Sequence, residues 1–163
     1  MERRLWRIVQ LIANMWHDGL VLDAGARKGS TAALIARTFR NRTVVTIDPS
    51  KQNVQHIRTQ YAATLSNLEV HRGGVSDDVG VMQYDADAVE KRPGSQVGFF
   101  WKRNNQGNAT FPLTTIDALC GERRVAFLHL DVEGMELAAL RGARNVVRTN
   151  LPFFTVEPHK ALP

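Results

Sequence analysis

The 163-residue sequence has little of several features that mark particular classes of protein. Its single cysteine, Cys120, cannot form an internal disulfide, which is typical of a reducing compartment, so we expect a cytoplasmic location. It also has no long hydrophobic run near its start, because Arg7, Gln10 and Asn14 interrupt the first apolar stretch. That stretch is unlike a signal peptide and too short to span a bilayer, so the sequence predicts no membrane span.

Basic charge is abundant but not concentrated. The formal net charge is +5, yet only five of the 21 basic residues are lysines, and the arginines are scattered along the chain. A nucleic-acid surface usually takes the form of a dense basic patch or stripe. Nucleic acid is therefore not the partner that the charge pattern favours.

Short apolar runs alternate with amphipathic stretches along the chain. Apolar residues recur at helical spacing over about residues 3–16. Strands are predicted at 20–25, 43–48, 68–75, 79–85, 125–131 and 153–159. Further helices are predicted at 30–39, 51–65 and 133–148. A short helix is also predicted that begins after Thr114 or Thr115 as its cap and ends at Gly121. This alternation indicates an α/β protein with a mostly parallel sheet flanked by helices. The length fits one domain, residues 1–163.

A turn with two glycines follows the first predicted strand. Asp23 lies at the end of that strand, and Gly25 and Gly29 precede an apolar helix. Ligands of open parallel sheets bind beyond the carboxyl ends of the strands. Gly25 lets a ligand approach the backbone, and the helix that Gly29 opens favours an anionic group. The G-x-G-x-x-G spacing of nicotinamide-binding proteins is missing here, and Asp23 favours a cationic amino group such as that of S-adenosylmethionine over a pyrophosphate.

Polar residues also follow the second and third predicted strands. Asp48 ends the second strand, where its carboxylate can accept hydrogen bonds from both ribose hydroxyls of an adenosine. Alternatively, Asp48 caps the helix that begins after Pro49. Ser76 and Asp77 are candidates for the adenine amino group, or they belong to an ordinary turn.

Six motifs resemble, in order and spacing, the FkbM family of S-adenosylmethionine-dependent methyltransferases over about residues 20–159. They are "LDAGARKGS", "VVTIDPS", "GGVSDDVG", "TTIDAL", "LHLDVEGMELAALRGA" and "FFTVEPH". The resemblance implies a Rossmann-like class I methyltransferase fold, S-adenosylmethionine as the cofactor, and methyl transfer to a hydroxyl of a sugar, glycan or natural product. The candidate cofactor-binding residues are Asp23, Gly25, Ala26, Gly29, Ser30, Asp48, Ser76 and Asp77.

The chain departs from the family pattern at three places. Arg27 replaces the asparagine that is usual in the family's turn, and Lys28 adds a second charge. His129 stands where a lysine is common, and we expect it to be a hydrogen-bonded core histidine. A class I sheet normally closes with an antiparallel strand pair, for which no sequence follows the strand at 153–159. We therefore expect a sheet without that pair, and a truncated C-terminal end or a non-catalytic remnant of the fold is an open alternative.

The predicted chemistry centres on the end of the strand at 125–131. A hydroxyl acceptor needs a general base, and Asp131 is the first candidate, followed by Glu133 and His159. In an extended segment Asp131 and Glu133 lie on the same side, so together with Glu157 or His159 they can also hold a divalent metal, although two carboxylates are weak support for one. Alternatively, Glu133 lies in the first turn of the next helix and stabilises its positive end.

Residues 91–108 combine Gly, Pro and Asn with the aromatic residues 99–101, which predicts a hairpin or a lid. Lys102 and Arg103 follow these aromatic residues, an arrangement that can stack on an acceptor sugar or base. This leaves an RNA methyltransferase as an alternative function, although packing of the aromatic rings onto the sheet is the interpretation we favour. The oligomeric state does not follow from any of these patterns.

Overall fold

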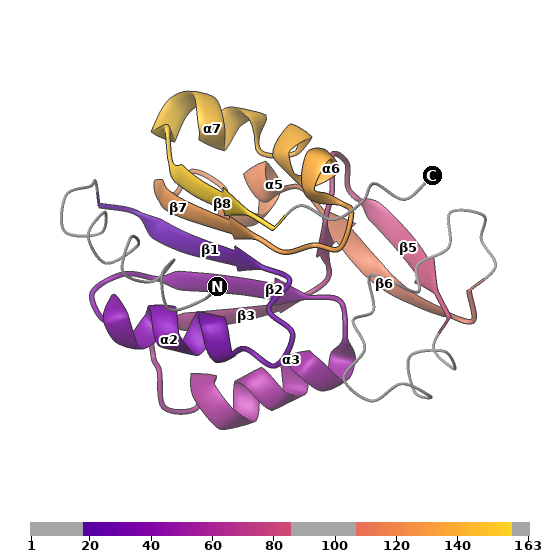
Figure 1. Ribbon diagram of the computed structural model, residues 1–163, viewed down its shortest axis with the longest axis horizontal. Helices are drawn as coiled ribbons and strands as arrows, with labels where there is room; N and C mark the ends of the chain where they lie inside the picture. Colours follow the sequence, from indigo (N-terminus) through magenta and orange to yellow (C-terminus); the bar gives the residue numbers. More distant parts are fainter. Residues whose placement is uncertain (1–17, 86–106, 158–163) are drawn as a thin grey trace.

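The computed structural model describes residues 18–85 and 107–157 (Figure 1). The helix predicted at about 3–16, most of the predicted lid at 91–108, and His159 lie outside the described residues.

Five parallel strands form the main sheet, in the order β3-β2-β1-β7-β8. They are β1 (Leu20–Ala24), β2 (Val44–Asp48), β3 (Leu68–Arg72), β7 (Val125–Leu130) and β8 (Phe153–Val156). The chain adds β2 and β3 on one side of β1, then β7 and β8 on the other, so the strand order reverses between β1 and β7. This confirms the predicted α/β class and is consistent with a Rossmann-like methyltransferase fold.

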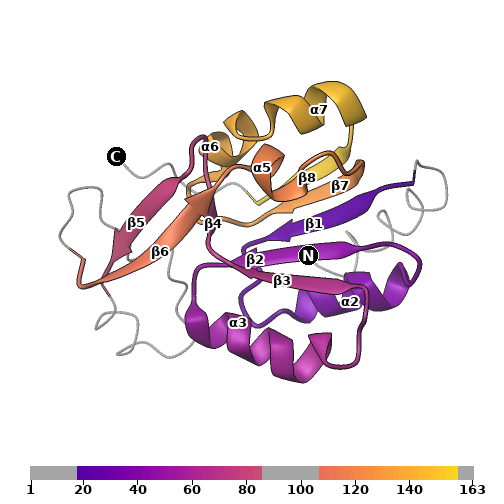
Figure 2. The ribbon, with the colours of Figure 1, turned by 180° about the vertical axis from the view of Figure 1, so that it is seen from behind.

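Helices cover both faces of this sheet (Figures 1 and 2). On one face lie α2 (Ser30–Thr38) and α3 (Lys51–Ile57), which continues into the π-helical turn η1 (Arg58–Ala62); on the other lie α5 (Ile116–Cys120), α6 (Glu136–Arg141) and α7 (Arg144–Asn150). Every residue of β1 and β2 is buried, and all are apolar apart from Asp23, Thr46 and Asp48. Their side chains alternate between the two helical layers. None of the helices in the described residues is long and apolar enough to cross a membrane.

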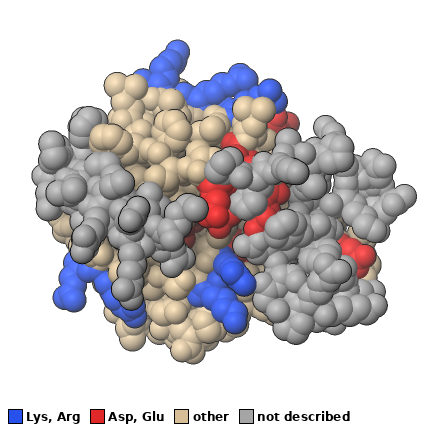
Figure 3. Space-filling model, in the orientation of Figure 1, with Lys and Arg blue, Asp and Glu red and all other residues tan. Residues whose placement is uncertain are grey.

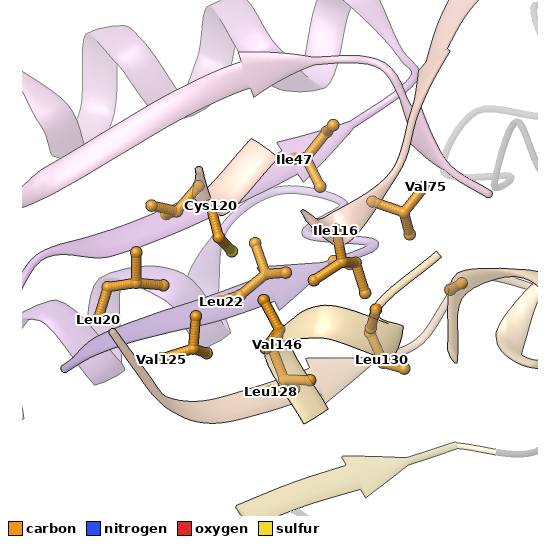
Figure 4. Close-up of a cluster of buried hydrophobic side chains, with 14 residues drawn as sticks. Leu20, Leu22, Ile47, Val75, Ile116, Cys120, Val125, Leu128, Leu130 and Val146 are labelled. Carbon is orange, nitrogen blue, oxygen red and sulfur yellow. The ribbon is translucent and has the colours of Figure 1, made fainter. Parts of the chain in front are cut away.

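Each face of the sheet has its own hydrophobic core. Val21, Ile35, Val44, Ile57 and Phe127 belong to the core beneath α2 and α3. On the other face, side chains from β1, β7, α5 and α7 meet in the core shown in Figure 4, whose members include Leu22, Ile116, Leu128 and Val146. Burying one such side chain contributes about 1.5–3 kcal/mol to the free energy of unfolding, so the two cores hold the strand ends in place.

A second, three-stranded sheet lies beside the carboxyl ends of the main strands (Figure 2). It consists of β4 (Gly74–Val75), β6 (Ala109–Thr114) and β5 (Gly80–Tyr84); β6 pairs parallel to β4 and antiparallel to β5. The predicted strand 68–75 is therefore divided between two sheets. The division falls at Gly73, where a β-carbon would come 2.8 Å from the carbonyl oxygen of Pro112 in β6.

The segment 133–148 was predicted as one helix, but it forms two, α6 and α7, so the prediction of a continuous helix was wrong. The break falls at Gly142, where a β-carbon would overlap the carbonyl oxygen of Ser76.

The predicted caps are confirmed: the Ser50 hydroxyl accepts a hydrogen bond from the Asn53 N–H (3.2 Å), and the Thr115 hydroxyl accepts one from the Ala118 N–H (3.0 Å).

Candidate functional site

A pocket of about 650 Å³ lies beyond the carboxyl ends of β1, β2 and β7, beside the point where the strand order reverses. This volume includes space that is open to solvent at the mouth of the pocket. The lining residues are Gly25, Arg27, Ile47, Asp48, Pro49, Asn53, Gly73, Gly74, Val75, Met82, Phe111, Leu113, Asp131, Val132, Glu133 and Met135. The charged ones follow the main strands, whereas the second sheet supplies an apolar wall.

The turn after β1 lies directly against the end of β7. Gly25 has a φ of 90°, and a β-carbon there would overlap the carbonyl oxygen of Asp131. The Asp131 N–H donates to the carbonyl oxygen of Ala24 (3.0 Å), and the Gly25 N–H donates to that of Ile47 (3.0 Å). The glycine that was predicted to let a ligand approach thus also lets these two pocket-lining segments touch.

Asp48 holds the turns around it through its carboxylate. Its Oδ2 accepts a hydrogen bond from the Arg27 N–H (2.7 Å), and its Oδ1 accepts from the Ser50 N–H (2.9 Å) and from the Asn53 side-chain amide (3.0 Å). Burial raises the pKa of Asp48 to about 6, against the opposing effect of these donors. The cap of α3 is the Ser50 side chain, and Asp48 instead joins the β1 turn to the start of α3.

Arg27 adopts a left-handed backbone conformation, with a φ of 51°. This conformation is costly for a residue with a β-carbon, and the hydrogen bond from its N–H to Asp48 keeps it there. The family turn usually has asparagine at this place, a residue that tolerates the conformation better. The contact with Asp48 is made by the backbone N–H of Arg27, whereas its side chain is exposed at the pocket.

Asp23 lies inside the sheet and is not among the residues that line this pocket. Its Oδ2 accepts a hydrogen bond from the Thr46 hydroxyl (3.2 Å), and its Oδ1 lies 3.9 Å from Nε2 of His129. Burial, the largest influence, raises the pKa of Asp23 above its ordinary value. His129 Nδ1 lies 2.9 Å from the Thr155 hydroxyl, which agrees with the expected hydrogen-bonded histidine.

Gly29, Ala26 and Ser30 also lie away from the lining of the pocket. Gly29 precedes α2 with a φ of 77°, and a β-carbon there would come 2.6 Å from Cγ1 of Ile57 in α3. Ala26 is buried in the core beneath these helices, and Ser30 is exposed at the start of α2. Helix packing therefore explains this second glycine without any ligand.

Ser76 and Asp77, predicted for the adenine amino group, follow the pocket segment Gly73–Val75 but do not line the pocket. Ser76 is buried; its N–H donates to the Thr114 carbonyl oxygen (2.9 Å) and its hydroxyl to Asp77 Oδ1 (3.1 Å). Asp77 itself is exposed. The geometry here is that of a turn linking β4 to β5, the two edge strands of the second sheet.

Asp131 and Glu133 both line the pocket just beyond the end of β7, but not as neighbours on one side of an extended segment. The strand ends at Leu130, and Glu133 is buried with a φ of 51°, so the segment is a turn without the alternation of an extended strand. Because α6 begins only at Glu136, Glu133 does not lie in its first turn. Glu157 is exposed, and within residues 18–85 and 107–157 no three His, Cys, Asp or Glu side chains are close enough together to hold a metal ion.

Sequence reasoning missed the apolar wall and one polar residue of the pocket. The wall is formed by Met82 of β5 and by Phe111 and Leu113 of β6, and the polar residue is Asn53 of α3. The alternation of apolar residues at 109, 111 and 113 was the available signal for β6.

Acidic side chains gather near the middle of the face shown in Figure 3, and Lys and Arg side chains lie along its upper edge and in its lower half, one group of them just below the acidic ones. Among the residues that the structure describes, the Lys and Arg side chains on this face lie in separate groups, unlike the continuous basic surface that binds phosphate backbones.

Comparisons with known proteins give one result. The family model described as the methyltransferase FkbM domain matches residues 23–162. No curated protein and no solved structure matches the chain.

Proposed function

The chain belongs to the methyltransferase FkbM domain family, and from that membership we propose that it is an S-adenosylmethionine-dependent O-methyltransferase. The proposed acceptor is a hydroxyl of a sugar, a glycan or a natural product. The observation that carries the proposal is that two carboxylates, Asp48 and Asp131, line one pocket at the reversal point of the sheet.

The residues of the pocket suit the cofactor that the family implies. Asp48 follows β2, at the place where an acidic side chain receives ribose hydroxyls in nucleoside-binding sheets of this kind. The wall formed by Met82, Phe111 and Leu113 suits an adenine ring, because flat apolar surfaces stack against aromatic and aliphatic side chains. The acidic lining also favours a cationic ligand. Asp23, buried behind the lining, would add to this favourable charge without direct contact.

When bound, S-adenosylmethionine supplies a methyl group on a positively charged sulfur. The chain's contribution is first to hold the acceptor hydroxyl in line with that group, and such positioning can lower a barrier by roughly 7–11 kcal/mol. We assign the proton transfer to Asp131, whose carboxylate lines the pocket and whose backbone is fixed to β1. A positioned base contributes a factor of about 10² to 10⁴ to the rate.

Glu133 is the second candidate for the base, because it lines the same pocket. It is more buried than Asp131, and its backbone is left-handed, with a φ of 51°. His159, the third candidate, lies outside the described residues. We propose no metal, and S-adenosylmethionine is the only cofactor in the proposal.

The proposal is tested by incubating the protein with S-adenosylmethionine labelled in its methyl group and a panel of sugars, glycans and polyketide alcohols. We expect label to appear on a hydroxyl of one acceptor. Asp131→Asn should lower kcat by a factor of about 10² to 10⁴ with little change in cofactor affinity, and Glu133→Gln separates the two candidate bases. An unlabelled panel with a protein that binds the cofactor would contradict the acceptor class, and full activity of Asp131→Asn would contradict the assigned base.

A further inference from the structure

The carboxylate of Asp48 is almost fully occupied by its own chain. It accepts three hydrogen bonds, two at Oδ1 from the Ser50 N–H and the Asn53 amide, and one at Oδ2 from the Arg27 N–H. A carboxylate can accept about four hydrogen bonds in all. One acceptor position therefore remains, and it belongs to Oδ2.

A ribose presents two neighbouring hydroxyls, and each of them can donate. With the three contacts intact, Asp48 can accept only one of these donors. The Ser50 and Arg27 donors are backbone groups, and Ser50 also caps α3 with its side chain. Giving up either of them would leave a backbone N–H without its acceptor, which is unfavourable. A second acceptor close to Asp48 would avoid that cost.

Asn53 is placed to be that acceptor. It lines the pocket, and its backbone is held in the first turn of α3 by the hydrogen bond from its N–H to the Ser50 hydroxyl (3.2 Å). Because an ionised carboxylate only accepts, the nitrogen of the Asn53 amide faces Asp48 at 3.0 Å, and the carbonyl oxygen points the other way. No described residue donates a hydrogen bond to that oxygen.

We propose that Asn53 is a specificity-determining residue, and that the ribose hydroxyls are divided between two side chains: Oδ2 of Asp48 accepts one, and the carbonyl oxygen of Asn53 accepts the other. This inference rests on the proposed function, because it concerns the adenosine part of the proposed cofactor. It predicts that the pocket detects each ribose hydroxyl separately, through a different residue.

The test compares the binding of S-adenosylhomocysteine with that of its 2′-deoxy and 3′-deoxy analogues by calorimetry. For the unmodified protein, each missing hydroxyl should weaken binding by about tenfold, the effect of one lost hydrogen bond. In Asn53→Ala, binding of the parent compound should fall by a similar factor. In that variant one of the two deoxy analogues should bind as well as the parent, while the other keeps its penalty. Asn53→Ser is a second variant with a small polar side chain, and should show the same selective loss.

Gln52→Ala is the matched control, since Gln52 is an exposed amide on the same helix and does not line the pocket. It should leave all three affinities unchanged. If Asn53→Ala weakens the parent and both analogues by the same factor, or weakens none, the division of the hydroxyls is wrong while the proposed function stands. If the unmodified protein does not bind S-adenosylhomocysteine at all, the inference and the proposed function both fail.

Discussion

The backbone of Gly25 touches that of Asp131, so closely that a β-carbon on residue 25 would overlap the carbonyl oxygen of residue 131. One of these residues follows β1 and the other follows β7, the two strands between which the sheet order reverses. Their contact sets the distance between the turn that is proposed to receive the cofactor and the carboxylate that is proposed to act on the acceptor. The geometry of the site therefore depends on the absence of a side chain at residue 25.

Gly25→Ala should destabilise the protein, because the new methyl group meets backbone atoms that cannot move aside and because a φ of 90° is strained for alanine. We expect the free energy of unfolding to fall by about 3 kcal/mol, measured by urea denaturation. Gly80→Ala is the control, since a β-carbon at Gly80 meets nothing within 4 Å. Equal stability of the two variants would show that the contact with Asp131 is not as tight as described.

Leu151→Gly should stabilise the protein. Leu151 ends α7 with a φ of 48°, a left-handed conformation that favours glycine, and it is 69% exposed, so little packing is lost. We expect a gain of about 1 kcal/mol in the free energy of unfolding, measured by thermal or urea denaturation. Leu151→Ala removes the same contacts but keeps a β-carbon, and it should show no gain; a gain of the same size there would refute the explanation by backbone strain.

The stability of the protein should decrease as the pH rises from about 4 to about 6. Burial raises the pKa of Asp48 from 3.8 to about 6, so the folded chain keeps a proton on this group that the unfolded chain has already released. The resulting loss in the free energy of unfolding is up to about 3 kcal/mol. Asp48→Asn should flatten this part of the curve of stability against pH. The pKa of Asp23 is also raised, in the unmodified protein and in Asp48→Asn alike. Parallel curves of stability against pH for these two proteins would therefore contradict the assignment of the pH dependence to Asp48.

Phe111→Ala should weaken both the fold and the site. Phe111 is 6% exposed, packs near Tyr84 with 5.8 Å between ring centroids, and forms part of the apolar pocket wall. Removing its ring should lower the free energy of unfolding by about 3–5 kcal/mol. Thr110→Ala, at the exposed neighbouring position in β6, is the control and should change it by less than about 0.5 kcal/mol. Similar losses in both variants would mean that the wall is not packed as described.

The sequence predicts the carboxylates of the site well because strand ends are local features. Asp48 and Asp131 each follow an apolar run, and parallel strands bring their carboxyl ends to the same edge, so both were expected beside a ligand and both line the pocket. Gly29 was predicted to bind a ligand by the same reasoning, but the packing of the start of α2 against Ile57 explains why this residue has no side chain. A contact between two helices that are distant in sequence leaves no local pattern.

The apolar wall was less predictable for a specific reason. Pro112 lies within β6, and proline usually argues against a strand that has partners on both sides. Similarly, nothing local in the run after Glu133 signals the break between α6 and α7, which arises because Gly142 meets Ser76 from another part of the chain. The single domain and the cytoplasmic location stay predictions from the sequence.

The most direct test of the account is a calorimetric titration of the protein with S-adenosylmethionine. We predict saturable binding of one molecule per chain, weakened in Asp48→Asn and not reduced by an excess of NADH. Absence of binding, together with saturation of the same pocket by NADH, would contradict the assignment of this pocket to a methyl donor.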